Sequence, residues 1–343
     1  MKILLIGGTG RISMAISRQL LAEGHDLYLI NRGSRSQELE QGLERRPIYL
    51  TGDVRDEAQM ASLLNGLSFD AVADFIAFDQ SDLERDYRLF SGKTHQFLYI
   101  SSASAYQKPL SHYQITESTP LANPFWEYSR KKIQGEEYLM NLYRTEQFPI
   151  TIVRPSHTYD QRSVPIGIHG SKGSYQVIRR ILDHKPVIIH GDGTSLWTVT
   201  HNSDFARAFI GLLGNIHAIG ESVHITSDET LTWNQIYSIL GSALGEPDFP
   251  RVHVSSDFLA ACGTVYGFSG SLWGDKAHSV VFDNTKLKRL VPGFTAVKRA
   301  DQGIREAVDY ILSHPECQIE DHEFDIWCDK VIAAREAALQ SLI

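Results

Sequence analysis

The 343-residue chain predicts an α/β fold in which a doubly wound parallel sheet carries helices on both faces. Two observations lead to this prediction. Short apolar runs alternate with amphipathic helical patterns through the first half of the chain, and a glycine-rich turn follows the first apolar run. Such alternation is typical of parallel sheets, because each parallel pair of strands needs a crossover connection.

The predicted elements follow one another closely. The candidate strands are residues 2–6, 26–30, 47–50, 70–75, 96–101 and 150–153, and the candidate helices between them are residues 11–22, 57–67 and 81–90. Right-handed crossovers bring the carboxyl ends of all these strands to one edge of the sheet, where ligands bind in such folds. After residue 155 the alternation loosens. Helical patterns at 174–183, 204–213, 234–240, 302–312 and 320–339, with one strand-like run at 187–190, predict a smaller cap over that edge.

Composition and charge exclude several classes of function. A net charge of −8 and a pI near 6.0 give no overall attraction to nucleic acid or to an anionic membrane surface. The chain shows no signal-peptide core and no apolar run near the ~18 residues that a membrane helix needs. Three cysteines without CxxC spacing and scattered histidines indicate no metal site. We therefore expect a soluble, cytoplasmic protein.

The turn after the first strand indicates a dinucleotide site. It is formed by Gly7, Gly8, Thr9, Gly10, Arg11 and Ile12. Glycines there let the backbone turn tightly and approach a pyrophosphate, whose charge would lie at the N-terminus of the following helix. Ser13 occupies the place of the usual third glycine and is small enough to keep the helix close to the strand. A turn that binds no ligand is the alternative.

The end of the second strand bears on the choice of cofactor. A carboxylate there would accept the ribose hydroxyls of NAD and repel a 2′-phosphate. The chain has Asn31, Arg32 and Arg35 instead, with no acidic residue before Glu38. Arginine suits a phosphate through its charge and its several donors, and Arg11 would add a third cation. We expect NADP, with NAD as the alternative cofactor; simply solvated arginines are the other interpretation.

A tyrosine and a lysine four residues apart predict proton transfer. Tyr128 and Lys132 lie about one turn apart on one face of a predicted helix. Free tyrosine has a pKa near ~10, and a neighbouring ammonium lowers it. Such pairs also arise by chance, as a half-buried ring beside a solvated lysine.

These motifs together resemble the extended short-chain dehydrogenase/reductase superfamily, in its NAD-dependent epimerase/dehydratase branch. The resemblance runs from residue 1 to about residue 294, through the glycine turn and residues 52–56, 98–106, 128–132 and 154–159. It implies a Rossmann-like dinucleotide-binding domain and a mainly C-terminal substrate-binding cap. We expect the first to comprise residues 1–155 plus roughly 198–226, the cap residues 156–197 and 227–315, and a C-terminal helix residues 316–343.

The resemblance implies a serine–tyrosine–lysine catalytic set. Its serine corresponds to Ser102, with Ser101 as the fallback, and would hydrogen-bond the reacting hydroxyl or carbonyl. Tyr128 would exchange the proton, and Lys132 would hold the nicotinamide ribose and lower the pKa of the tyrosine. Further cofactor contacts are expected at Asp53, Val54, Ile76, Ala77, Ser101, Pro155 and His157. Substrate contacts are expected at Phe78, Ser104, Tyr106, His157 and Trp197.

Three of these residues have two interpretations. Asp53 would accept a hydrogen bond from the adenine amino group or cap a turn. His157 is either an acid/base or substrate hydrogen-bonding group, or a histidine satisfied by nearby backbone. Trp197, where many relatives hold a substrate pyrophosphate with an arginine, either stacks on the substrate or packs in the core. Ala103 and Ser104 replace the Asp-Glu pair of 4,6-dehydratases, which argues against dehydration.

The expected function is an NAD(P)-dependent epimerase or reductase that acts on a hydroxyl or carbonyl of a sugar or sugar nucleotide, with a homodimer as a family-level expectation. The arginines favour an exchangeable NADP and hence a reductase, whereas the family as a whole favours an epimerase. A non-catalytic dinucleotide-binding regulator or RNA-associated protein is the alternative. Regulators commonly lose the tyrosine or the lysine, and the acidic net charge disfavours RNA.

Overall fold

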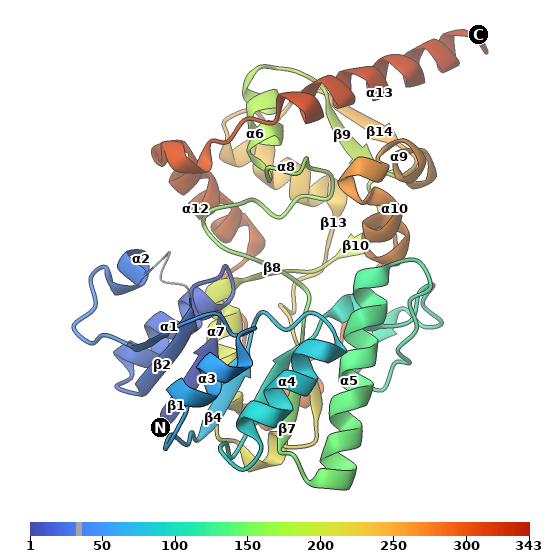
Figure 1. The fold of residues 1–343 in the computed structure, drawn as a ribbon. Helices are drawn as coiled ribbons and strands as arrows, with labels where there is room; N and C mark the ends of the chain where they lie inside the picture. Colours follow the sequence, from blue (N-terminus) through green and yellow to red (C-terminus); the bar gives the residue numbers. More distant parts are fainter. Residues whose placement is uncertain (32–35) are drawn as a thin grey trace.

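The computed structural model describes residues 1–31 and 36–343 and confirms the predicted α/β fold (Figure 1). Within the described residues, a seven-stranded parallel sheet has the order β12-β7-β5-β4-β1-β2-β3. Its strands are β1 (Lys2–Ile6), β2 (Asp26–Asn31), β3 (Ile48–Thr51), β4 (Ala71–Asp74), β5 (Phe97–Ile100), β7 (Ile150–Pro155) and β12 (Ser222–Ile225). The chain moves outward in both directions from β1, so the switch point between β1 and β4 opens a crevice at the carboxyl edge.

Helices cover both faces of the sheet (Figure 1). One face carries α1 (Ser13–Ala22) and α7 (Asn202–Leu212), which pack against each other, and the other carries α3 (Glu57–Leu63), α4 (Gln80–Phe90) and α5 (Glu127–Glu146). Because both faces are buried, β4 and β5 consist of buried residues; β5 is apolar throughout, and β4 is apolar up to Asp74 at its carboxyl end. This is why the central strands could be found in the sequence.

The seventh strand, β12, lies outside the six that the sequence predicts. Its four residues include the polar Ser222 and His224, so the run gives no apolar signal. The His224 ring is nevertheless completely buried. Its burial is possible because Nε2 forms a hydrogen bond with the carbonyl oxygen of Asp283 at 2.8 Å. A tertiary contact, which local pattern cannot reveal, therefore completes the sheet.

The cap has an apolar core of its own around Trp233 and Tyr237. Its main elements are α6 (Tyr175–Leu182), β9 (Val187–His190), α8 (Trp233–Ala243), β14 (Arg251–Val254), α9 (Ser256–Cys262), α10 (Phe268–Ser271), α12 (Ala300–Ser313) and α13 (His322–Gln340). The shorter elements of the whole chain, in the cap and outside it, are α2 (Ser36–Glu40), β6 (Gln114–Ile115), β8 (His157–Tyr159), β10 (Leu196–Trp197), β11 (Val199–His201), β13 (Leu231–Thr232), β15 (Val281–Phe282) and α11 (Thr285–Leu290). Trp327 stacks on Phe324 with ring centroids 5.7 Å apart.

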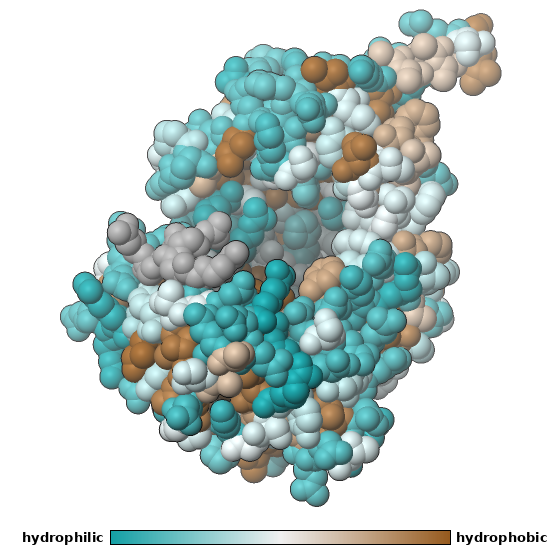
Figure 2. All heavy atoms as spheres, in the orientation of Figure 1, coloured by the Kyte–Doolittle hydropathy of each residue, from teal (hydrophilic) through white to brown (hydrophobic). Residues whose placement is uncertain are grey.

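The surface is hollowed where the cap meets the carboxyl edge of the sheet (Figure 2). The last helix, α13, packs its first half on the cap and extends beyond the body of the molecule (Figure 1). Of the helices that the structure describes, none is both long and apolar enough to cross a bilayer.

Candidate active site

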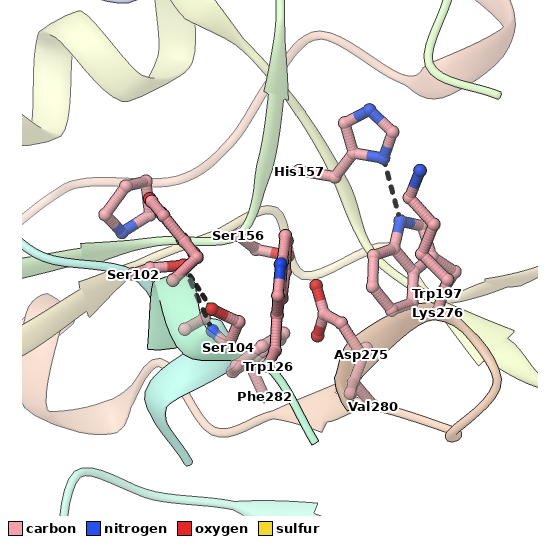
Figure 3. A pocket seen from close by; sticks show the side chains of 13 residues that line it. Ser102, Ser104, Trp126, Ser156, His157, Trp197, Asp275, Lys276, Val280 and Phe282 are labelled. Carbon is pink, nitrogen blue, oxygen red and sulfur yellow. Dashed lines mark hydrogen bonds between the residues drawn. The ribbon is translucent and has the colours of Figure 1, made fainter. Parts of the chain in front are cut away.

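A cavity of about 260 Å³ lies where the carboxyl ends of β5 and β7 meet the cap (Figure 3). Six of the predicted site residues line it: Ser102, Ser104, Tyr128, Pro155, His157 and Trp197. The sequence analysis missed the other lining residues, which are Ala103, Trp126, Ser156, Asp275, Lys276, Val280 and Phe282. The cavity is thus built from both parts of the chain.

Tyr128 lies in the first turn of α5 with its ring among aromatic neighbours. The ring centroids of Trp126 and Phe78 are 5.0 and 5.5 Å away. Burial raises the pKa of Tyr128, and a hydrogen bond with the Ser102 side chain opposes that rise. The expected lowering of this pKa by the neighbouring lysine is therefore not found. Tyr128 is a neutral phenol near pH 7 and can donate a proton.

The reason lies in the contacts of Lys132. Its Nζ donates hydrogen bonds to the carbonyl oxygens of Ala77, at 2.8 Å, and Ile100, at 2.9 Å. The Nζ is 5.9 Å from the centroid of the Tyr128 ring, and burial lowers the lysine pKa to about 8. An ammonium has three donors, and the two carbonyl oxygens take two of them.

The two candidate serines point in different directions. Ser102 Oγ lies 2.9 Å from Ser104 Oγ (Figure 3). Ser104 Oγ accepts a hydrogen bond from Ser129 Oγ at 2.8 Å. Ser101 instead donates to Glu136 in the buried layer behind the strand and is 2% exposed. Ser102, and not the fallback Ser101, faces the cavity.

The glycine turn has the geometry that a pyrophosphate needs. Gly7 has φ +78°, and a Cβ there would lie 2.5 Å from Ile76 Cγ2. Ser13 Oγ donates to the Gly7 carbonyl oxygen at 2.6 Å and accepts from the Gly10 amide at 2.9 Å. The serine that replaces the third glycine thus stabilises the turn at the start of α1. These residues fit the phosphate end of a dinucleotide.

Adding a methyl group at this turn should weaken dinucleotide binding. We expect Gly7→Ala to lower NADPH affinity about tenfold or more, because the new Cβ displaces Ile76 and strains a backbone that favours glycine. Isothermal titration measures the affinity. Gly92→Ala is the matched control, since Gly92 has φ +71° and open space around its Cα. Equal affinities of the two variants would contradict this role of the turn.

The other predicted cofactor residues are placed as follows. Asn31 ends β2, and its carbonyl oxygen accepts the Gly52 amide at 3.3 Å. Asp53 Oδ1 accepts the Arg55 amide at 3.0 Å, which is the turn-capping geometry. Val54 is 4% exposed and packs in the core, so its side chain points away from the crevice. The predicted phosphate-binding residues Arg32 and Arg35 lie outside the described residues.

The loop after β4 connects the glycine turn to the cavity. Ile76 is half exposed beside Gly7, Ala77 is buried and its carbonyl oxygen binds Lys132, and Phe78 is half exposed beside Tyr128. Thr9 and Arg11 continue the turn on its other side, where the Arg11 carbonyl oxygen accepts the Asn202 side-chain amide at 3.1 Å. The loop thus lies between the proposed phosphate and nicotinamide positions.

His157 and Trp197 form a pair at the cap side of the cavity. The Trp197 indole N–H donates to His157 Nδ1 at 3.0 Å (Figure 3), and burial lowers the pKa of His157 to about 3. So weak a base does not suit acid/base work near neutral pH. Trp197 is 3% exposed and stacks on Trp233 with centroids 5.0 Å apart. The tryptophan therefore packs as core while its edge reaches the cavity.

Tyr106 departs from its expected place. It is completely buried, and its hydroxyl lies 3.0 Å from His224 Nδ1 and 3.2 Å from the Arg154 guanidinium. The structure does not bring it to the cavity that Tyr128 lines. The expected substrate contact of Tyr106 is replaced by a structural role that holds β12 to β7.

Two kinds of residue escaped sequence reasoning. Trp126 precedes Tyr128 by two positions, and that spacing could have suggested a shared wall. Asp275 and Lys276 come from a π-helical turn, Leu272–Lys276, which has no period or motif of its own. Within the described residues, no three His, Cys, Asp or Glu side chains gather as a metal site would require.

The parallel sheet, its glycine turn and the tyrosine–lysine pair at its carboxyl edge define a dinucleotide-binding enzyme of the extended short-chain dehydrogenase type. The NAD dependent epimerase/dehydratase family matches residues 3–226, and the chain belongs to this family. The predicted family is thereby confirmed.

Individual relatives and solved structures differ in what they do. The chain is similar to 2′-dehydrokanamycin reductase of Streptomyces kanamyceticus, at 27% identity over 86% of this chain and 80% of the relative. It is also similar to the chloroplast stem-loop binding protein of 41 kDa b of Arabidopsis thaliana, at 25% identity over 74% of this chain and 65% of the relative. The structure of UDP-glucose 4-epimerase from Bifidobacterium longum, in complex with NAD+ and UDP, aligns with a TM-score of 0.72 at 18% identity, covering 93% of this chain and 100% of that one.

Proposed function

We propose that this protein is a nicotinamide-dependent reductase of a carbonyl group on a sugar-like substrate, and that it uses Ser102, Tyr128 and Lys132. The observation that carries the proposal is the position of the Tyr128 hydroxyl at the cavity, hydrogen-bonded with the Ser102 side chain and one helical turn from the lysine. A phenol kept neutral by burial is the form that a reductase needs, because reduction consumes a proton.

Each residue has a distinct part in this reaction. Bound nicotinamide supplies the hydride that the substrate carbon receives. Ser102 Oγ holds the carbonyl oxygen, and the Tyr128 hydroxyl gives that oxygen its proton. Lys132 fixes the loop after β4 through Ala77 and offers its third donor to the ribose. The relative from Streptomyces kanamyceticus, a reductase by name, supports this direction. Trp197 stands where many relatives hold a substrate pyrophosphate with an arginine, which favours a sugar substrate without a nucleotide diphosphate.

We propose NADP as the cofactor, on the strength of Arg32 and Arg35 in the sequence after β2. The double variant Arg32→Ala/Arg35→Ala should weaken NADPH binding about tenfold or more and leave NADH binding within about twofold, because only NADP carries the 2′-phosphate. Fluorescence titration with both nucleotides measures this. Arg335→Ala, in the exposed part of α13, is the control. Equal losses for NADPH and NADH would reject the assignment.

The test of the function itself is NADPH oxidation, followed at 340 nm, with a panel of keto-sugars. Epimerisation is the second candidate, favoured by family membership and by NAD-bound epimerases among the similar folds. An epimerase retains its nucleotide through each cycle. Protein that purifies with bound nucleotide and interconverts sugars without net NADPH oxidation would favour the epimerase, and a protein free of nucleotide would favour the reductase.

The proposed domain division follows the packing. β12 joins the sheet and α7 packs on α1, which supports adding roughly residues 198–226 to the dinucleotide-binding domain of residues 1–155. Residues 156–197 and 227–315 contribute to the cap core, and α13 packs on α6 and β9. We propose that the C-terminal helix is part of the cap.

A further inference from the structure

The cavity contains charged side chains that the proposed hydride transfer does not use. Asp275 and Lys276 reach it from the π-helical turn in the cap, and Lys108 lies behind Asp275. The Lys108 Nζ is 3.8 Å from Asp275 Oδ1, so the two groups form an ion pair but are too far apart for a hydrogen bond. The lysine side chain is 0% exposed. Within the described residues, this Nζ has no hydrogen-bond partner. Its charge therefore acts mainly on the carboxylate.

The three charged groups face in different directions. Lys108 is sealed from the cavity, and Lys276 Nζ donates to the Gly167 carbonyl oxygen at 2.9 Å. Asp275 keeps 20% of its side chain exposed. Figure 3 shows its carboxylate projecting between the Trp126 and Trp197 rings. Of the three, the carboxylate is the group presented to a ligand.

Local packing fixes this carboxylate relative to the proton donor. A Cβ at Gly274 would lie 2.6 Å from Trp126 Cβ, and the Asn123 side-chain amide donates to the Gly274 carbonyl oxygen at 2.7 Å. Trp126 in turn is the N-cap residue of α5, two positions before Tyr128. π-Helical turns recur at functional sites. Here the turn holds Asp275 at a set position from the Tyr128 ring.

We propose that Asp275 is a specificity-determining residue that accepts a hydrogen bond from a hydroxyl group of a neutral sugar ring, away from the reacting carbon. This inference rests on the proposed reductase function, because it names the substrate class of the same cavity. Trp126 provides an aromatic wall for the C–H face of such a ring. The carboxylate and its neighbouring aromatic ring thus fit the two surfaces of a sugar.

The directions in which the three charged groups point favour a neutral ligand over a charged one. Lys108 and Lys276 both act on Asp275, lowering a pKa that burial raises. Two cations therefore already flank one carboxylate, and a substrate ammonium would bring a third. A phosphate would meet the Asp275 charge at short range. A hydroxyl group donates a hydrogen bond to the carboxylate and brings neither a third cation nor a second anion to the site.

The inference is tested by binding, which needs no turnover. The ligands are methyl glycosides of glucose, galactose and mannose and their monodeoxy analogues. Each is titrated into the 343-residue protein saturated with NADP+, and saturation-transfer NMR measures its binding. We expect at least one parent glycoside to bind, one deoxy analogue of it to bind about tenfold more weakly, and Asp275→Leu to abolish that difference. The proposal would be overturned if the wild-type protein bound no glycoside. It would also be overturned if the affinity difference between the parent glycoside and its deoxy analogue persisted in Asp275→Leu.

Controls separate this inference from folding and from the reaction. Asp275→Leu leaves Lys108 buried without its counter-charge, so the double variant Lys108→Met/Asp275→Leu, which removes both charges, is tested in parallel and should show the same lost difference. Asp248→Leu, an exposed carboxylate of the cap, should keep it. The glycoside that carries an amino group in place of the hydroxyl identified by the deoxy series is also titrated. If it binds more tightly than the parent glycoside, Asp275 binds an ammonium group and the proposal is overturned. Absence of NADPH oxidation with every keto-sugar would reject the reductase function alone.

Discussion

Replacing Tyr128 by phenylalanine should lower kcat about 10²–10⁴-fold, the range that general acid catalysis contributes, while NADPH affinity stays within about twofold. The ring packing on Trp126 and Phe78 remains, and only the hydroxyl that donates the proton is lost. Steady-state NADPH oxidation gives kcat, and titration gives the affinity. Turnover near the wild-type value would contradict the proposed role.

The matched control is Tyr113→Phe, a hydroxyl deletion on a ring that is 70% exposed. It should leave kcat unchanged. The pH profile gives a second readout, because the pKa of Lys132 is about 8. Below that pH the lysine is an ammonium and holds its carbonyl oxygens and the ribose. We expect kcat/KM for reduction to fall as pH rises through about 8.

Arg154→Met should cost about 3–5 kcal/mol of unfolding free energy, because it leaves a buried carboxylate without its counter-charge. The guanidinium and Glu136 form an ion pair whose side chains are 5% and 3% exposed, and Glu136 also accepts the Ser101 hydroxyl. Urea unfolding measures the loss.

Removing both charges should recover much of that cost, so Arg154→Met/Glu136→Met is expected to be more stable than Arg154→Met alone. Arg299→Met, which breaks an exposed ion pair with Asp301, should leave stability nearly unchanged. If the Arg154 and Arg299 variants unfold at the same urea concentration, the buried pair contributes nothing specific.

Local pattern predicted the central sheet and the helix that carries Tyr128 and Lys132, because both leave a regular periodicity in the sequence. Strands β1, β4 and β5 are buried on both faces, and Tyr128 and Lys132 keep helical spacing. The resemblance to a known family then supplied Ser102.

The features that the sequence did not predict depend on contacts between segments that are far apart in the chain. β12 is stabilised through a buried histidine, Tyr106 is drawn into the Arg154 network, and Asp275 reaches the cavity from a turn almost 150 residues beyond Tyr128 in the sequence. The expectation for the Tyr128 pKa was wrong, because the spacing of a lysine does not show where its ammonium points. In this chain the ammonium binds main-chain carbonyls.

That arrangement has a consequence for how the protein can diversify. The oxygens that Lys132 binds belong to the main chain of Ala77 and Ile100, so the anchor is insensitive to which side chains surround it. Ile76 and Phe78, on either side of Ala77, are half exposed, and Lys132 does not bind their side chains. Substitutions at these two neighbours therefore leave the main-chain oxygens that hold Lys132 in place.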